Sequence, residues 1–179
     1  MKLVVPSPIM PVVALLVAVT ALPVEAASRY RACSLLTTAE LETALRVKVS
    51  GTNERDTVIS RGPHQGRTMS GCTWIMGGGY LSVSVFPQRP TEAPWQAALT
   101  VLGQTLQDLK RRGWSIEPAA IPGAECSTAR PPARERGAGP VVTCFMERRG
   151  FALGLYAVRM DLTPLQVRTL GDRAASRLP

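Results

Sequence analysis

The clearest pattern in the chain is an alternation of apolar and polar residues over 80–86, where leucine and valine are separated by serines. A period of two is typical of a β-strand with one buried and one polar face. A second strand-like run, 72–76, precedes it across the glycines 77–79. Two such runs joined by glycines predict a β-hairpin whose second strand is half buried.

The same pattern returns near the C-terminus, where the segments 140–147 and 151–159 flank Arg148-Arg149-Gly150. These segments predict a second hairpin. Its first strand carries Cys144, as the first hairpin carries Cys72, and each hairpin precedes a predicted helix. The similarity favours two hairpin-plus-helix units, although any hairpin followed by a helix produces this outline.

The proposed repeat can be written as an alignment of short motifs. Gly79-Tyr80 of the first hairpin matches Gly150-Phe151 of the second. With this match the second unit is one residue shorter between its cysteine and its glycine.

Three segments predict helices. A capping box, Thr37 with Glu40, starts the first helix, over 38–46. The second covers 91–113, where apolar residues recur at spacings of three and four. The third begins at Thr163, which is followed by proline and, three residues on, by a glutamine.

The remaining segments predict short strands and loops. Strands are expected at 47–49 and 57–60 on either side of a polar loop at 51–56, and another strand at 114–121. The segment 129–140, rich in proline, glycine and arginine, predicts an exposed loop. Together these elements predict an α+β fold of two layers, an antiparallel sheet with helices packed on one face.

Residues 1–26 are typical of a bacterial secretion signal. Lys2 gives the positive start, 9–24 carries no charge, and Val24 and Ala26 are small residues suited to cleavage after position 26. A retained membrane anchor is the alternative, but the run contains prolines and is shorter than the ~20 apolar residues of a spanning helix. We therefore expect one domain over 27–179, periplasmic or secreted, without stable membrane insertion.

Charge narrows the set of partners. The chain has 18 arginines, 3 lysines and a formal net charge of +8. Guanidinium groups suit phosphate and carboxylate partners. The arginines are scattered, however, and alanine and proline are also frequent, which a bias in composition would equally produce. Nucleic acid is not an expected partner of an exported protein.

Four cysteines in an exported chain predict two disulfides. Four cysteines allow three pairings. We favour Cys33 with Cys72 and Cys126 with Cys144, because each bridge then ties a hairpin to the segment before it. A zinc site is disfavoured because His64 is the single histidine, so no metal or cofactor is expected.

The residues of the common catalytic mechanisms are few. A nucleophile–base pair would need His64, which lies in a loop with glycine and proline, and no serine has the G-x-S-x-G surroundings of a hydrolase. Glutamates such as Glu117 and Glu147 could form a carboxylate pair, but nothing in their surroundings distinguishes them. We therefore expect a protein that is not an enzyme.

Binding residues are predicted only in outline. Trp74, on the first hairpin, is the best aromatic candidate for a ligand platform, but burial beside the bridge at Cys72 is favoured, since tryptophan near a disulfide usually packs. Arg148 and Arg149, at the tip of the second hairpin, are candidate contacts for an anionic ligand, but a solvated fringe is slightly favoured because Glu135 and Glu147 are interleaved. The loop arginines that could join them are Arg130, Arg134 and Arg136.

The run from Cys33 to Leu41 (CSLLTTAEL), followed by Gly71-Cys72-Thr73-Trp74 and a strand, resembles the opening of small cysteine-containing envelope proteins known mostly from actinobacteria. Many of those are lipoproteins of unknown function. The later part is similar in outline to them and to the extracellular sensor domain of an actinobacterial serine/threonine kinase. The resemblance implies a disulfide-linked α+β sheet that binds a ligand or partner, and no catalytic residue. This chain differs in lacking a lipidation cysteine.

The sequence thus predicts a secreted or periplasmic binding or sensor-like module for an unknown envelope ligand or protein. The alternatives are a hydrolase of envelope material that uses carboxylates, and a proteinaceous inhibitor that inserts the 129–140 loop into an envelope enzyme. Two carboxyls with shifted pKa values facing one pocket would favour the enzyme. An apolar or arginine-lined groove without them would favour the binding module.

Overall fold

The structure, a computed structural model, describes residues 31–58, 66, 68–87 and 106–179. The predicted signal peptide, His64 and most of the predicted helix over 91–113 lie outside the described residues. Within the described ranges, no helix combines the length and the apolar character needed to cross a membrane.

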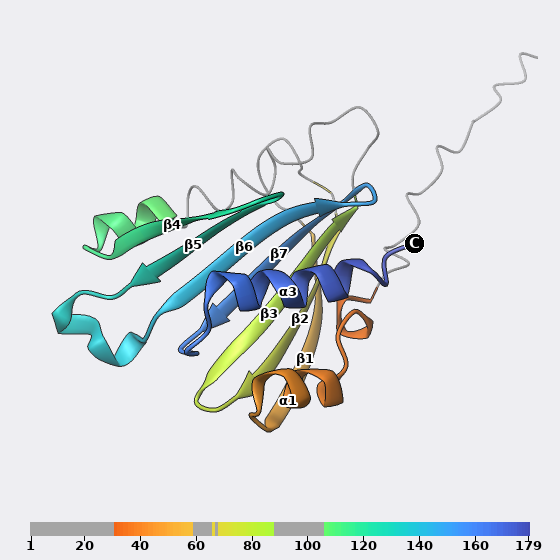
Figure 1. Cartoon of the computed structure of the whole chain (residues 1–179), viewed down its shortest axis with the longest axis horizontal. Helices are drawn as coiled ribbons and strands as arrows, with labels where there is room; N and C mark the ends of the chain where they lie inside the picture. Colours follow the sequence, from red (N-terminus) through yellow and green to blue (C-terminus); the bar gives the residue numbers. More distant parts are fainter. Residues whose placement is uncertain (1–30, 59–65, 67, 88–105) are drawn as a thin grey trace, which may run out of the picture.

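Seven antiparallel strands form a single sheet (Figure 1). The strands are β1 Val49–Val58, β2 Thr68–Met76, β3 Gly79–Pro87, β4 Ser115–Ile121, β5 Ala124–Arg130, β6 Val141–Arg148 and β7 Phe151–Val158. Their order across the sheet is β1-β2-β3-β7-β6-β5-β4. The two predicted hairpins, β2-β3 and β6-β7, are therefore side by side at the centre, where β3 pairs with β7.

Two strands differ from the sequence prediction. Residues 51–56, predicted as a loop between two short strands, belong to the continuous strand β1. Because β1 lies at the edge of the sheet, its charged side chains remain in solvent, and a loop-like composition is compatible with an edge strand. The prediction has no counterpart of β5, whose residues 126–129 are all buried and show no alternation.

Both central hairpins close through two-residue turns. Gly77 and Gly78 have φ of 57° and 78°, and Arg149 and Gly150 have φ of 52° and 76°. Two successive residues in the left-handed region are typical of the type I′ turn, which matches the twist of the flanking strands. The backbone of the two turns is therefore closely similar although only one has two glycines.

The structure corrects the alignment of the repeat. The pair that closes the second hairpin, Arg148 and Phe151, lies 72 residues after the pair that closes the first, Met76 and Gly79. The same offset separates the two hairpin cysteines. Gly150 therefore matches Gly78 rather than Gly79, and the spacing from the cysteine to this turn glycine is the same in both hairpins.

The two complete helices are α1 (Thr38–Leu45) and α3 (Pro164–Ala175), and a 3-10 turn, η1 (Ala32–Ser34), precedes α1. Both predicted capping boxes are present, at the first turn of each helix. Side chains of α1, η1 and α3 form the main core with one face of the sheet, which α3 crosses (Figure 1). The largest fully buried side chains of this core include Trp74, Leu36, Leu41, Met146, Leu153 and Leu155.

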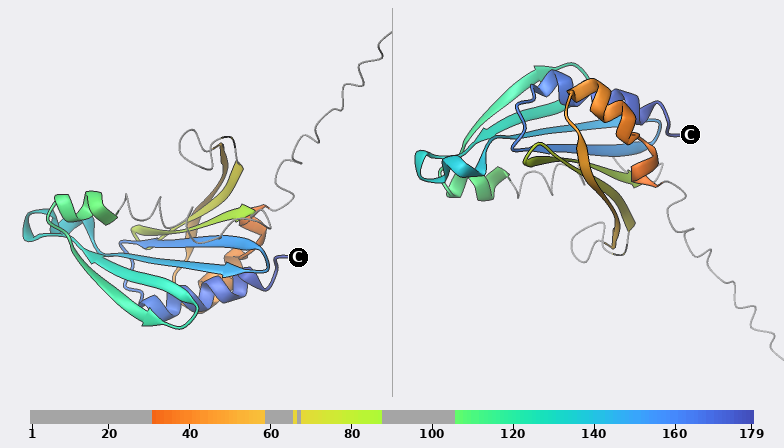
Figure 2. Two further views of the ribbon diagram at one scale, coloured as in Figure 1. Left: turned by 90° about the horizontal axis from the view of Figure 1, so that it is seen from above. Right: turned by 90° about the horizontal axis from the view of Figure 1, so that it is seen from below.

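A smaller cluster lies on the opposite face, where Leu106 packs against Phe145 and Ala152. Residues 106–111 are helical, and Figure 2 shows this helical segment on the side of the sheet away from α3. The prediction of helices packed on one face is therefore not confirmed, and neither is a duplicated hairpin-plus-helix unit. The α+β class, the antiparallel sheet and the two disulfides are confirmed.

The disulfides have the favoured pairing, Cys33 with Cys72 and Cys126 with Cys144. The first ties η1 to β2, and the second joins two directly opposed residues of β5 and β6. Each bridge thus links a hairpin to the segment before it, which was the reason for favouring this pairing. All four cysteines are used.

Candidate functional site

The sheet face away from α3 contains a hollow of about 990 Å³, which we call the sheet-face hollow. It lies over β2, β3 and β7 and is bounded by residues 106–114 and by the loop before β6. Small-molecule sites have volumes of about 300–1,000 Å³, so the hollow is large enough for a ligand. Its main apolar lining residues are Ile75, Tyr80, Phe86, Leu109, Tyr156 and Val158.

The alternation of β3 explains the depth of the hollow. Ser82 and Ser84 are small side chains between the larger Tyr80 and Phe86, and all four line the hollow. The Ser82 hydroxyl oxygen lies 2.5 Å from Oγ1 of Thr73, so these two hydroxyls hydrogen-bond to each other. The serines therefore create space on the sheet, and the hydroxyl of Ser82 is already occupied.

Tyr156 forms part of the wall. Its ring meets the ring of Phe145 edge to face, with centroids 5.5 Å apart and an interplanar angle of 87°. Burial raises the pKa of Tyr156 to about 12, because the phenolate would lose its hydration. The wall is therefore an uncharged aromatic surface at physiological pH.

A second wall is built around Trp114, which is buried just before β4. Its indole N–H donates to Oε2 of Glu135 at 3.1 Å, and Nη2 of Arg112 donates to the same oxygen at 2.6 Å. The guanidinium of Arg112 also lies 5.8 Å from the centroid of the indole ring. The hydrogen bond from Trp114, followed by the contacts and charge of Arg112 and the charge of Arg134, lowers the pKa of Glu135. Glu135 is thus an ionised partner that already engages Arg112.

Arg159 follows β7 directly and has φ of 57°, a left-handed conformation that costs a non-glycine residue about 1–2 kcal/mol. Its backbone N–H donates to the carbonyl of Pro140 at 2.9 Å, and its Nε donates to the carbonyl of Ala138 at 3.1 Å. Gly139 makes room for it, since a Cβ there would lie 2.9 Å from Cγ of Arg159. No carboxylate of the described residues forms an ion pair with Arg159. The loop therefore fixes at the hollow an arginine that has no acidic partner in the described part of the chain.

Trp74, the predicted aromatic platform, lies elsewhere. Its side chain is 1% exposed and belongs to the main core on the α3 side of the sheet. Cys72 is part of the same cluster, so the favoured burial near the bridge is confirmed. Trp74 is not among the residues of the sheet-face hollow.

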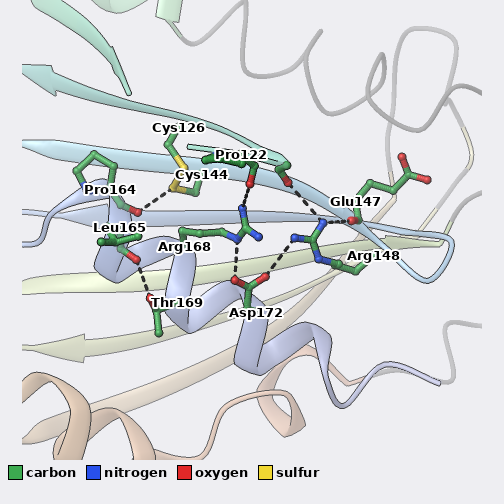
Figure 3. A network of polar contacts seen from close by, with 11 residues as sticks. Pro122, Cys126, Cys144, Glu147, Arg148, Pro164, Leu165, Arg168, Thr169 and Asp172 are labelled. Carbon is green, nitrogen blue, oxygen red and sulfur yellow. Dashed lines mark hydrogen bonds and ion pairs between the residues drawn. A yellow bond between two sulfur atoms is a disulfide. The ribbon is translucent and has the colours of Figure 1, made fainter. Parts of the chain in front are cut away.

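Arg148 and Arg149 hold the end of the second hairpin to the C-terminal segment. Figure 3 shows Arg148 with its partners. Arg148 donates through Nη2 to Asp172 at 3.3 Å and through Nη1 to the carbonyls of Glu147 and Gly123. Arg149 donates to the carbonyl of Leu178 at 2.7 Å.

Asp172 also accepts from Nε of Arg168 at 2.8 Å, and Arg168 donates to the carbonyl of Pro122 (Figure 3). The carboxylate of Asp172 thus orients two arginines: Arg168, which links α3 to the β4-β5 turn, and Arg148, which links α3 to the second hairpin. These arginines have structural partners and lie outside the sheet-face hollow.

The predicted gathering of arginines at one end does not occur in the described residues. Arg130 and Arg134 precede β6, whereas Arg148 ends it. The eight residues of β6 separate the two groups, which corresponds to about 23 Å of extended strand. The side chain of Arg136 lies outside the part of the chain that the structure describes.

The sequence analysis missed Arg112 and Arg159, the two arginines that line the hollow. A signal was present in the alternation of β3, because Tyr80 and Phe86 flank the two serines on the supposedly polar face. Aromatic residues on that face indicate that it is not simply solvated. Nothing in the sequence identifies Arg159, whose position depends on the pairing of β7 with β3 and β6.

Few of the described residues that line the hollow are of types common in catalytic sites. No aspartate, glutamate or histidine is among the described residues that line it, and no group of three metal-ligating side chains occurs in the described ranges. Hydrogen bonds from Arg177 and Thr37 lower the pKa of Glu40 to about 2, so this carboxyl is ionised and committed to the capping box and an ion pair.

No protein-family model matches the chain, and a search of curated proteins found no similar sequence.

Proposed function

We propose that this protein is a non-enzymatic binding module, secreted or periplasmic, that holds a small apolar or amphipathic ligand in the sheet-face hollow. The observation that carries the proposal is the hollow itself, about 990 Å³ in volume and lined largely by aliphatic and aromatic side chains. Two of these, Ile75 and Tyr80, are 50% and 39% exposed. Contiguous exposed apolar surface with a few polar groups marks a binding site on a soluble protein.

The location outside the cytosol is supported by the two disulfides, since such bridges persist in oxidising compartments. The expected signal at 1–26 points the same way. The proposed module is the domain expected over 27–179.

The hydrolase alternative has less support. It needs two carboxyls that face one pocket, one of them protonated at working pH. Glu40 and Glu135 both have lowered pKa values and are held in ion pairs. Neither is among the residues of the hollow.

The inhibitor alternative needs a protruding loop over 129–140. In the structure this segment contains a 3-10 turn, η2 (Ala133–Ala138), whose Glu135 and Ala138 contact Trp114, Arg112 and Arg159. The loop is thereby tied to the walls of the hollow. This arrangement favours a role in shaping the site over insertion into another protein.

The proposal is tested with N-phenyl-1-naphthylamine, an uncharged probe whose fluorescence increases in apolar surroundings. The disulfide-bonded wild-type chain is expected to bind the probe saturably. Ile75→Glu places a charge in the hollow and is expected to weaken binding at least tenfold. Leu165→Glu is the matched control, because Leu165 is 64% exposed and lies on α3, across the sheet from the hollow.

Two results would contradict the proposal. The first is absence of saturable probe binding by the wild-type chain. The second is an Ile75→Glu variant that binds as tightly as Leu165→Glu, with both variants folded by circular dichroism.

A further inference from the structure

The geometry points to a specific class of ligand: a single-chain amphiphile with an acidic headgroup, its carboxylate or phosphate bound by Arg159 and its hydrocarbon tail lying along β3. This inference rests on the proposed function and adds the chemistry of the ligand. It follows from the shape of the hollow, the distribution of charge around it and the way Arg159 is held.

The hollow is elongated along β3. From Tyr80 to Phe86 its floor covers six residue steps, which correspond to about 20 Å of strand. An acyl chain spans one leaflet of a bilayer whose hydrocarbon core is about 30 Å thick, so it reaches about 15 Å. One extended acyl chain therefore fits along the floor, above the two serines.

Among the described residues that line the hollow, charge is confined to one end of this floor. Tyr80 pairs with Val158, so Arg159, the next residue of the chain, lies beyond the Tyr80 end. Around Phe86 the lining residues are Met69 and Ser84, and none of these three carries a charge. A ligand with one charged end is therefore favoured over a uniformly apolar or a uniformly polar molecule.

The sign of that charge follows from the arginines around η2. Arg134 belongs to η2, Arg112 and Arg159 contact it, and Glu135 is the carboxylate that pairs with Arg112 and lies 3.9 Å from Arg134. Among these described side chains, three guanidiniums against one carboxylate leave two positive charges. An anionic headgroup is attracted to this end, and a cationic headgroup is repelled.

Arg159 is the arginine suited to the headgroup. Its Nε is occupied by the carbonyl of Ala138, and among the described residues its two terminal nitrogens have no carboxylate partner. Carboxylate and phosphate both accept hydrogen bonds from a guanidinium in fork geometry. The left-handed backbone and the fit against Gly139 hold the side chain in place before a ligand arrives.

The test compares four ligands that share a dodecyl chain: dodecanoate, dodecyl phosphate, dodecanol and dodecyltrimethylammonium. Each is titrated against N-phenyl-1-naphthylamine bound to the disulfide-bonded chain, the three ionic ligands below their critical micelle concentrations and dodecanol below its solubility limit. For the wild type we expect the two acids to displace the probe at a concentration at least tenfold lower than the alcohol, and the cation to be weakest. The ratio of carboxylate to phosphate affinity distinguishes the two headgroups.

Arg159→Asn removes the guanidinium and keeps a residue that tolerates positive φ. We expect it to bind the uncharged probe as the wild type does and to lose the preference for acids over the alcohol. Arg46→Asn is the matched control, because Arg46 is also an arginine with positive φ, 55°, and lies at the end of α1 outside the hollow. It is expected to retain the preference.

The outcomes separate the two proposals. If the wild type does not bind the uncharged probe, the proposed function fails. If the probe binds but dodecanoate, dodecyl phosphate and dodecanol compete equally, the inference about the headgroup fails alone, and the wild-type comparison decides this without any variant. A preference for acids that persists in Arg159→Asn also overturns the role of Arg159.

Discussion

Alanine at Gly79 is expected to destabilise the protein far more than alanine at Gly78, although both belong to one run of three glycines. Gly78 has φ of 78°, and a Cβ there would have no atom within 4 Å. At Gly79 a Cβ would lie 2.7 Å from the carbonyl oxygen of Arg159 and closer still to that of Val158. Position 78 requires glycine because of its left-handed backbone conformation, whereas position 79 requires glycine because there is no space for a Cβ.

The magnitudes follow from these two causes. The left-handed conformation costs alanine about 1–2 kcal/mol, and reduced freedom of the unfolded chain offsets about 0.4–1 kcal/mol, so Gly78→Ala is expected to lose about 1 kcal/mol. In Gly79→Ala the unfolded chain loses the same freedom, which offsets the same amount. The added Cβ, however, meets the backbone carbonyls of Val158 and Arg159 at the end of β7. Overpacking costs about 1–3 kcal/mol, and fixed backbone places this case near 3 kcal/mol.

The assay is urea unfolding of the disulfide-bonded chain, followed by tryptophan fluorescence, since Trp74 and Trp114 are buried. The free energy of unfolding of Gly79→Ala is expected to be about 1.5 kcal/mol below that of Gly78→Ala, because the unfolded-state contribution is common to both and the overpacking cost exceeds the backbone cost by this amount. Equal losses of unfolding free energy in the two variants would refute the close approach of Gly79 to the backbone of Val158 and Arg159. A larger loss for Gly78→Ala would refute it as well.

Three further predictions concern the contacts that hold the fold. Glu40→Gln is expected to flatten the acid dependence of stability, because folding lowers the pKa of Glu40 from 4.5 to about 2. The stabilisation from this carboxylate is complete above pH 4.5 and disappears as the pH falls toward 2. Urea midpoints between pH 7 and pH 2.5 measure this effect, and parallel curves for wild type and variant would contradict it. Asp172→Asn is expected to lower the free energy of unfolding by about 1 kcal/mol, because it removes the ion pairs with Arg148 and Arg168. Asp161→Asn, at an exposed residue, is the control, and an equal loss in both variants would contradict a stabilising role of these ion pairs. Replacing both Cys126 and Cys144 by serine is expected to lower the free energy of unfolding by about 3 kcal/mol, because the bridge closes a loop of 18 residues in the unfolded chain. Non-reducing peptide mapping of the wild-type chain checks the pairing, and a different partner for either cysteine would contradict it.

The parts of the fold that were predicted from sequence depend on local chemistry. The two hairpins follow from strand alternation and turn residues, and the helix starts follow from capping boxes at Thr37 and Thr163. The disulfide pairing followed from the order of these elements along the chain.

The parts that the sequence did not reveal depend on non-local pairing. β1 resembles a loop because an edge strand exposes its polar residues, and β5 lacks alternation because it is covered on both faces. The candidate site was placed at Trp74, Arg148 and Arg149, which the structure uses for the core and for fixing the C-terminal segment. The hollow and Arg159 emerge only when β7 lies between β3 and β6.

The most direct test of the central claim, that the sheet-face hollow holds an anionic amphiphile, is an isotope-filtered NMR experiment on the disulfide-bonded chain with dodecanoate. The account predicts nuclear Overhauser contacts from the methylene protons of the ligand to Ile75, Tyr80 and Phe86, with the carboxyl end nearest Arg159. Contacts to Leu165 and the exposed side of α3 instead, or no contacts at saturating ligand, would contradict it.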